Sequence, residues 1–133
     1  GLQFDEYLKI ANGETLLIPL IETRDAAENI DAILDVPGLE AIFFGPADLS
    51  ASSGALGQWE GPGIAEEILA IRQKAADRGI ASGVMATDLE NSLQRRKQGF
   101  HLIGLGSDMG LLIRALSENL DALGRKKDSI SLF

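Results

Sequence analysis

Two acidic residues stand where two apolar segments end, and their placement suggests a metal site. Glu22 directly follows the run TLLIPLI, and Asp48 follows the run AIFF after a Gly45-Pro46 turn. If the two runs are neighbouring parallel strands, the two carboxylates are close enough to share one hard cation such as Mg²⁺. The pattern leaves one alternative open, in which Asp48 is a turn residue that bonds its own backbone.

Oxygen-bearing side chains also follow two further predicted strands, but helix capping accounts for them. Thr87 and Asp88 precede one helical pattern, and Ser107 precedes the last one. These residue types commonly begin helices because their side chains accept hydrogen bonds from free backbone amides. Glutamate is a poor type for that position, and Thr23 is better suited to cap the helix after Glu22. We therefore interpret Glu22 and Asp48 as the candidate ligands.

Other catalytic chemistries find little support. The lysines lie on polar helical positions or in the tail, so none ends a strand to form a Schiff base. The single histidine, His101, opens the fourth predicted strand and belongs to the opposite edge of the sheet. The segment GLGSDMG at 104–110 resembles a dinucleotide fingerprint only weakly, because its last glycine comes one place late. A phosphate- or nucleotide-binding α/β domain remains an alternative.

The elements that position these residues alternate between strand and helix, which predicts an α/β fold with a parallel sheet. Strands are expected at 15–21, 41–44, 80–86 and 100–105. Helices are expected at 2–11, 24–34 and 64–78, with one more ending at 98 and another closing at Gly124. A glycine-rich loop covers 50–63. Four such units form either a small open doubly wound sheet or half of an eight-unit barrel, and both place function at the carboxyl ends of the strands.

Composition bounds the class of protein. The 133 residues carry a net charge of −8, 45% hydrophobic residues and no cysteine. These values predict a single soluble globular domain, and the negative charge argues against general nucleic-acid binding. No apolar run reaches the ~20 residues needed to span a bilayer, and no signal peptide begins the chain, so we expect a cytoplasmic protein without a membrane partner.

Taken together, four segments carry a resemblance to a known family: PLIETRDAAENIDAIL, AIFFGPADLSAS, GVMA and IGLGSDMGLL. They are similar to the HpcH/HpaI family of metal-dependent class II pyruvate aldolases. The resemblance implies a TIM barrel, (β/α)8, of which residues 1–124 are the C-terminal half, with 125–133 as a polar C-terminal tail. It also implies reversible cleavage of a 4-hydroxy-2-oxo acid to pyruvate and an aldehyde.

The resemblance assigns roles to particular residues. Glu22 and Asp48 would be the two protein ligands of a divalent metal, Mg²⁺ or Mn²⁺, which acts as a Lewis acid on the 2-oxo acid. Met85 would line the aldehyde side of the site. The turn whose backbone amides would hold the carboxylate of pyruvate consists of Gly45, Pro46, Ala47 and Asp48.

The chain also departs from the family pattern. Leu20 occupies a place where the family usually has glutamine, and the substrate arginine and base-assisting histidine belong to the first half of the barrel. Arg24 and His101 do not replace them by position. The alternatives are therefore a non-catalytic module that binds metal and 2-oxo acids, or a carbon–carbon lyase acting on CoA esters. Trp59 in the glycine-rich loop contributes either to aldehyde choice or to an interface.

The half-barrel interpretation carries one further expectation. Four units leave an unclosed sheet with exposed edges and one apolar face, which is a liability unless another half or subunit covers it. We therefore expect the chain by itself either to self-associate or to fold poorly, and the protein to be a homo-oligomer.

Overall fold

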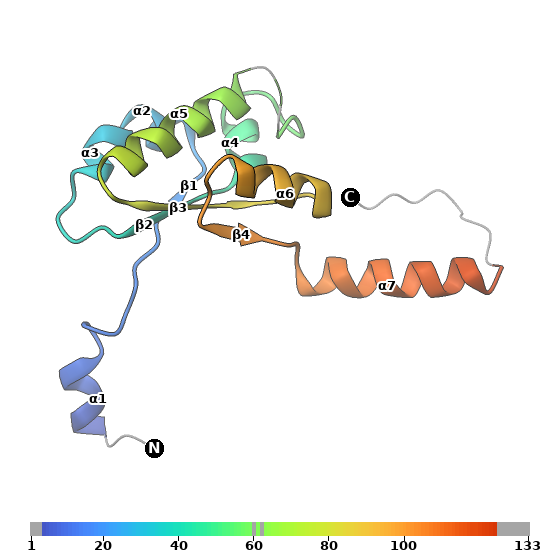
Figure 1. Ribbon diagram of the computed structural model, residues 1–133, viewed down its shortest axis with the longest axis horizontal. Coiled ribbons are helices and arrows are strands. Elements are labelled where there is room, and N and C mark those ends of the chain that lie inside the picture. Colours follow the sequence, from blue (N-terminus) through green and yellow to red (C-terminus); the bar gives the residue numbers. More distant parts are fainter. Residues whose placement is uncertain (1–3, 60, 62, 125–133) are drawn as a thin grey trace.

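The computed structural model describes residues 4–59, 61 and 63–124 of the chain. The predicted tail at 125–133 and the first two residues of the helix predicted at 2–11 lie outside the described residues. Figure 1 shows the elements. The helices are α1 (Phe4–Ile10), α2 (Arg24–Glu28), α3 (Ile30–Leu34), α4 (Pro46–Ser52), α5 (Ile64–Asp77), α6 (Leu89–Lys97) and α7 (Asp108–Ala122), and the strands are β1 (Leu20–Ile21), β2 (Ala41–Phe44), β3 (Ala81–Met85) and β4 (Leu102–Gly104).

The strands form one parallel sheet in the order β1-β2-β3-β4, which confirms the predicted α/β architecture. Phe44 lies beside Ile21 on one side and Val84 on the other, and Met85 lies beside Gly104. Because all neighbours are parallel, the carboxyl ends of all four described strands lie at one edge of the sheet.

The first strand is shorter than the predicted segment 15–21. Pro19 cannot donate to a strand ladder, although its carbonyl still accepts a hydrogen bond from the Phe43 amide at 2.9 Å. Leu16 and Leu17 are 53% and 74% exposed, so the apolar run before Pro19 is not buried in this chain. Only Leu20 and Ile21 pair as a strand.

The predictions for one helix and one loop also need correction. The helix expected at 24–34 is interrupted at Asn29, whose side-chain amide donates to the Asp25 carbonyl at 2.8 Å. Asparagine favours such local bonds over continuation of a helix. The loop expected at 50–63 starts later, because α4 extends through Ser52. Pro46 begins α4 with a preset φ, and the fully buried Leu49 anchors it.

The hydrophobic core lies between one face of the sheet and the helices α2 to α5. Figure 1 shows α2, α3, α4 and α5 on the same side of the sheet. The predicted core positions of α5 are all buried, as are Ile42, Phe44 and Val84 from the sheet. The residues that α5 contributes are Ile64, Ile68, Ile71 and Ala75.

Ion pairs join α3 to α5 on the outer surface of this layer. Asp31 accepts from Lys74 Nζ at 2.6 Å and from Arg78 Nη2 at 3.0 Å, and Asp35 accepts from Arg78 Nε at 3.0 Å. The hydrogen bond from Lys74 holds the pKa of Asp31 below its ordinary value. The bond to Asp35 correspondingly raises the pKa of Arg78.

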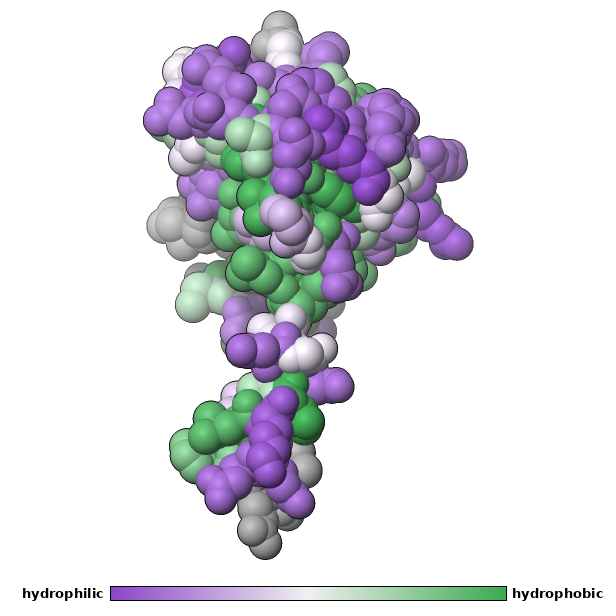
Figure 2. All heavy atoms as spheres, turned by 90° about the vertical axis from the view of Figure 1, so that its left-hand side faces the viewer, coloured by the Kyte–Doolittle hydropathy of each residue, from purple (hydrophilic) through white to green (hydrophobic). Residues whose placement is uncertain are grey.

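No helix within the described ranges covers the opposite face of the sheet. Leu20 and Leu102 point to this side at 55% and 39% exposure, together with the half-buried Phe43 and Met85. Figure 2 shows hydrophilic side chains over the helical layer and hydrophobic ones gathered beneath it, toward the segment that leads to α1. The described chain thus leaves an apolar sheet face open to solvent.

The first and last described helices extend away from the sheet (Figure 1). No residue of α1 or α7 is buried. The apolar side chains of α7 are exposed along its whole length, from Met109 at 65% to Leu120 at 37%. None of the described helices is long and apolar enough to cross a membrane.

Candidate functional site

The two candidate ligands come together at the carboxyl edge of the sheet. Glu22 directly follows β1, and Asp48 lies in the first turn of α4, which begins right after β2. A β-carbon placed on Gly45 would lie 2.9 Å from Glu22 Oε2 and 3.6 Å from Asp48 Oδ2. The two carboxylate oxygens are therefore separated by no more than the sum of these two distances. The predicted proximity of Glu22 and Asp48 is present in the fold.

Gly45 makes this proximity possible by having no side chain. Its φ of −102° and ψ of 85° are accessible to other residues, so backbone conformation does not require glycine here. The requirement is clearance, because a β-carbon would also lie 3.0 Å from Glu22 Cβ. The Gly45 amide donates to the Ile21 carbonyl at 3.3 Å, which continues the β1–β2 pairing to the residue before Glu22.

The position of Asp48 follows from the packing of α4. Pro46, Leu49 and Ser50 are buried beneath the helix, and the Ser50 hydroxyl donates to the Ala47 carbonyl at 2.7 Å. The Leu49 amide donates to the Gly45 carbonyl at 2.9 Å and closes the first turn. These contacts fix Gly45 to Asp48 as a rigid turn from which the Asp48 side chain projects to the surface.

Both carboxylates are without a partner among the residues that the structure describes. Glu22 is half-buried and Asp48 is exposed, and neither makes a hydrogen bond or ion pair within 4–59, 61 and 63–124. Asp108, which begins α7 after β4 at the same edge of the sheet, behaves differently, since its Oδ1 accepts from the Met109 amide at 2.7 Å. The alternative in which Asp48 bonds its own backbone is therefore not observed.

The residues interpreted as helix caps have that role with one exception. Thr23 accepts from the Ala26 amide at 3.1 Å, and Ser107 accepts from the Gly110 amide at 3.1 Å. Asp88, rather than Thr87, begins α6, and its bond from the Asn91 amide lowers the pKa of Asp88. Thr87 donates to Asp88 Oδ2 at 3.1 Å instead. Helix capping thus accounts for the Ser107 end of the GLGSDMG segment without a bound phosphate.

Arg24 lies close in sequence to Glu22 but turns to the helical layer. Its guanidinium contacts Glu28 at 2.9 Å and Glu67 at 3.0 Å, and the bond to Glu28 raises the pKa of Arg24. Its backbone amide donates to Ser52 Oγ at 2.8 Å, which ties the start of α2 to the end of α4. Arg24 therefore supports the two helices that flank the site.

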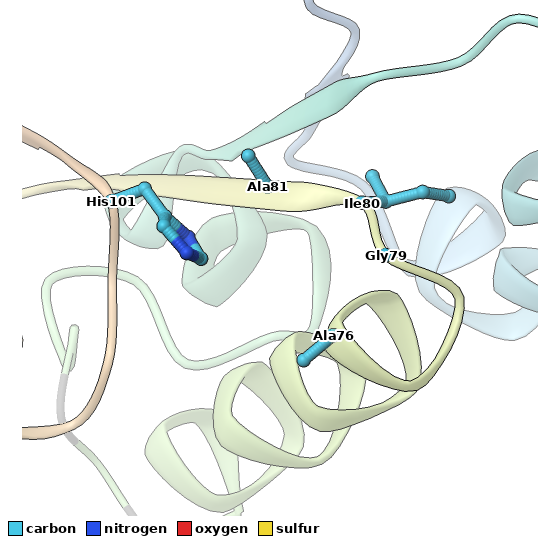
Figure 3. Close-up of a pocket in the computed structure, with 5 residues that line it drawn as sticks. All are labelled: Ala76, Gly79, Ile80, Ala81 and His101. Carbon is cyan, nitrogen blue, oxygen red and sulfur yellow. The ribbon is translucent and has the colours of Figure 1, made fainter.

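His101 lies at the other edge of the sheet, as predicted. It lines a pocket of about 220 Å³ with Ala76, Gly79, Ile80 and Ala81, at the amino end of β3 (Figure 3). The Ser82 amide donates to His101 Nδ1 at 3.4 Å. Within the described part of the chain, no group of three or more His, Cys, Asp or Glu side chains is placed to hold a metal, so Glu22 and Asp48 stand as a pair.

Met85 ends β3 at the same edge as the two carboxylates. It is half-buried, and its register partner on β4 is Gly104. Sequence reasoning did not single out Gly104 as a neighbour of Met85. Its glycine identity within a predicted strand was the available sign, because such glycines mark close approach of a neighbouring group.

Comparison with known proteins identifies relatives over most of the chain. The family model described as HpcH/HpaI aldolase/citrate lyase matches residues 3–115. The hydroxypyruvate/pyruvate aldolase of Roseobacter denitrificans is 36% identical over 111 residues, which is 84% of this chain and 43% of that protein. The 4-hydroxy-2-oxo-heptane-1,7-dioate aldolase of Shigella flexneri is 34% identical over 127 residues, or 96% of this chain and 47% of that protein.

Solved structures give the same result for the fold. An HpcH/HpaI aldolase/citrate lyase family protein from Burkholderia cenocepacia superposes with a TM-score of 0.83 at 30% identity, covering 90% of this chain and 46% of that one. The citrate synthase SbnG superposes with a TM-score of 0.80 at 27% identity, covering 91% of this chain and 49% of that one. The chain spans less than half the length of the curated relatives it matches. Its four strand–helix units are about half of a TIM barrel, as predicted.

Proposed function

The chain belongs to the HpcH/HpaI aldolase/citrate lyase family, and we propose that it is the part of a class II pyruvate aldolase that binds the metal and the 2-oxo acid. The observation that carries the proposal is the approach of Glu22 and Asp48 to one another across Gly45. Neither carboxylate is used by the fold, since neither bonds to another described residue. Two carboxylates that lie close together at the active edge of a half-barrel, without another described partner, are suitable ligands for one hard cation.

The chemistry of this donor pair fits Mg²⁺ or Mn²⁺. Both ions prefer hard oxygen ligands, and Mg²⁺ typically takes only one or two protein carboxylates and completes its shell with water and substrate. Glu22 and Asp48 would hold the ion, and the chain offers no cysteine for a softer metal. When bound, the ion supplies Lewis acidity that stabilises negative charge on the 2-oxo group.

The proposed reaction is cleavage of a 4-hydroxy-2-oxo acid. Removal of the 4-hydroxyl proton breaks the C3–C4 bond, releases an aldehyde and leaves the electron pair on the pyruvate portion, which is then protonated at C3. The turn formed by Gly45, Pro46, Ala47 and Asp48 orients the substrate carboxylate, and Met85 shapes the aldehyde side. The family resemblance assigns the base-assisting histidine and the substrate arginine to the first barrel half, so turnover requires that half.

The same proposal includes assembly into a homo-oligomer. The open sheet face and the exposed apolar side chains of α7 give the chain large surfaces that are unfavourable in water. A first barrel half would cover the sheet face, and a further subunit is needed for what remains exposed.

The proposal is tested by Mn²⁺ binding with and without oxalate, which mimics the enolate form of pyruvate. We expect oxalate to strengthen Mn²⁺ binding to the unmodified chain, and Glu22→Ala and Asp48→Ala to abolish that effect. Asp108→Ala is the matched control, because Asp108 is an acidic residue at the same edge whose side chain bonds Met109. A chain that melts cooperatively but binds Mn²⁺ no better with oxalate would refute the proposal.

A non-catalytic module that binds metal and 2-oxo acids is the second candidate. It is favoured by Leu20, which stands two residues before Glu22 where the family pattern usually has a glutamine. The two candidates separate when the first half of a relative is supplied in trans. Turnover by the reconstituted pair supports the aldolase, and oxalate-strengthened Mn²⁺ binding without turnover supports the module.

A further inference from the structure

Along the carboxyl edge of the sheet, residues with long side chains alternate with glycines. Gly45 and Met85 are the residues that follow the register pair Phe44 and Val84, and Met85 in turn pairs with Gly104. With Glu22 after β1, the row across the sheet is therefore carboxylate, glycine, thioether, glycine. Each long side chain of this row, that of Glu22 or Met85, therefore lies beside a glycine in or directly after a neighbouring strand.

The space beside each of the two glycines is filled by a different neighbouring side chain. The three atoms nearest to a β-carbon on Gly45 belong to Glu22 and Asp48. At Gly104 all three belong to Met85, since a β-carbon would collide with Met85 Sδ and lie 3.1 Å from Met85 Cε. Met85 therefore leans toward β4, and the space in front of Gly45 is left to the two carboxylates.

Backbone conformation does not explain the glycine at 104. Gly104 is not among the glycines with positive φ, and it lies within a regular strand where glycine is ordinarily unfavourable. The same packing recurs one row below, where a β-carbon on Gly83 would lie 2.8 Å from Phe43 Cε2. The positions of the glycines on this face thus determine the direction in which Phe43 and Met85 point.

We propose that Gly104 is a specificity-determining residue, because it lets the Met85 thioether lean away from the Glu22 and Asp48 carboxylates and so keeps room beside them for an extended substrate. The inference rests on the proposed function. A side chain at position 104 turns Met85 back toward Gly45, which follows β2, the neighbour of β3 on its other side. The site then admits a small ligand but rejects a 2-oxo acid with a longer chain.

The first test compares two ligands in the presence of Mn²⁺: oxalate and 2-oxohexanoate. Gly104→Ala should bind oxalate within about twofold of the unmodified chain and 2-oxohexanoate at least about tenfold more weakly, as expected for a pocket narrowed by one methyl group. Met85→Ala combined with Gly104→Ala should recover the longer acid, because it removes the group that moved. Gly13→Ala is the matched control, since a β-carbon there meets only the Ile10 carbonyl at 3.5 Å.

Several outcomes overturn the inference. If Gly104→Ala weakens the binding of oxalate and of 2-oxohexanoate equally, Gly104 does not act through Met85. The same conclusion follows if the double variant does not recover binding of 2-oxohexanoate. Failure of the unmodified chain to bind the longer acid while it binds oxalate would mean that Met85 already closes the space. If Gly104→Ala does not fold, Met85→Ala alone decides: selective weakening of the longer acid in that variant contradicts the proposal.

A second measurement observes Met85 itself. The chain has two methionines, so methyl-¹³C labelling gives one resonance for Met85 and one for Met109. Gly104→Ala should shift the Met85 methyl and leave Met109, which is 65% exposed on α7, unchanged. An unmoved Met85 resonance refutes the contact whether or not metal binds. Survival of Mn²⁺–oxalate binding in Glu22→Ala, in contrast, refutes the proposed function alone.

Discussion

Replacing Gly45 by alanine should damage the proposed metal site more than the fold. The new β-carbon would lie 3.0 Å from Glu22 Cβ, closer than the ~3.5–4.0 Å at which carbon atoms normally pack, and 2.9 Å from Glu22 Oε2. Asp48 Oδ2, at 3.6 Å, is in ordinary contact and need not move. The substitution therefore displaces one carboxylate of the pair while it leaves the other in place.

The size of the effect follows from which group can move. Glu22 directly follows the paired residue Ile21, so its backbone is restrained and the side chain must rotate away from Gly45. Crowding a half-buried position of this kind costs about 1–3 kcal/mol of stability. Misorientation of a metal ligand typically costs about 10–100-fold in metal affinity, and we expect a loss in that range.

The assay is titration of Mn²⁺ in the presence of oxalate, with thermal unfolding measured on the same samples. Gly13→Ala is the control, because its β-carbon has only an ordinary contact at 3.5 Å and should leave both properties unchanged. Unchanged Mn²⁺ affinity in Gly45→Ala, together with lost binding in Glu22→Ala, would refute the reasoning. It would mean that Glu22 reaches the metal from a conformation that does not cross Gly45.

Three further predictions concern the fold and the assembly. Ile68→Ala removes a fully buried side chain of α5 and should lower the free energy of unfolding by about 2–5 kcal/mol, measured by urea denaturation. Because the pKa of Asp31 is lower in the folded than in the unfolded chain, its ion pairs stabilise the fold above the unfolded-state pKa, and this stability is lost as pH falls through the folded-state pKa. Asp31→Asn should therefore reduce the drop in Tm on acidification. The unmodified chain should self-associate in sedimentation experiments, and Leu112→Glu, at a site 60% exposed on α7, should weaken that association; a monodisperse monomer with a cooperative melt would contradict it.

The sequence was most informative where one kind of interaction decides local structure. The continuous apolar run at 41–44 became β2 with the predicted bounds, because a buried strand has few alternatives. The apolar spacing of Ile64, Ile68 and Ile71 placed the buried side of α5 correctly. The order of elements then implied a parallel sheet, and the ends of its strands brought Glu22 near Asp48.

Predictions failed where two local preferences compete. The run before Ile21 is apolar enough for a buried strand, but Pro19 cannot donate and Leu17 has no layer to pack against in this chain. At Asn29 the helical pattern continues, yet the side-chain bond to Asp25 divides the helix. The segment after Pro46 combines turn residues with helix starters, and burial of Leu49 settles it in favour of α4.

The candidate site depends on the sheet more than on the loops around it. Glu22 follows a residue held by the β1–β2 ladder, Asp48 projects from a turn fixed by buried Leu49, and Met85 belongs to β3 itself. Their relative positions are therefore set by strand register and by the clearances at Gly45 and Gly104. A constellation built on rigid elements can keep its geometry while neighbouring loops change. Under the proposed function, Glu22 and Asp48 would keep their relative positions while the groups around them, such as the Met85 side chain, determine which substrate is accepted.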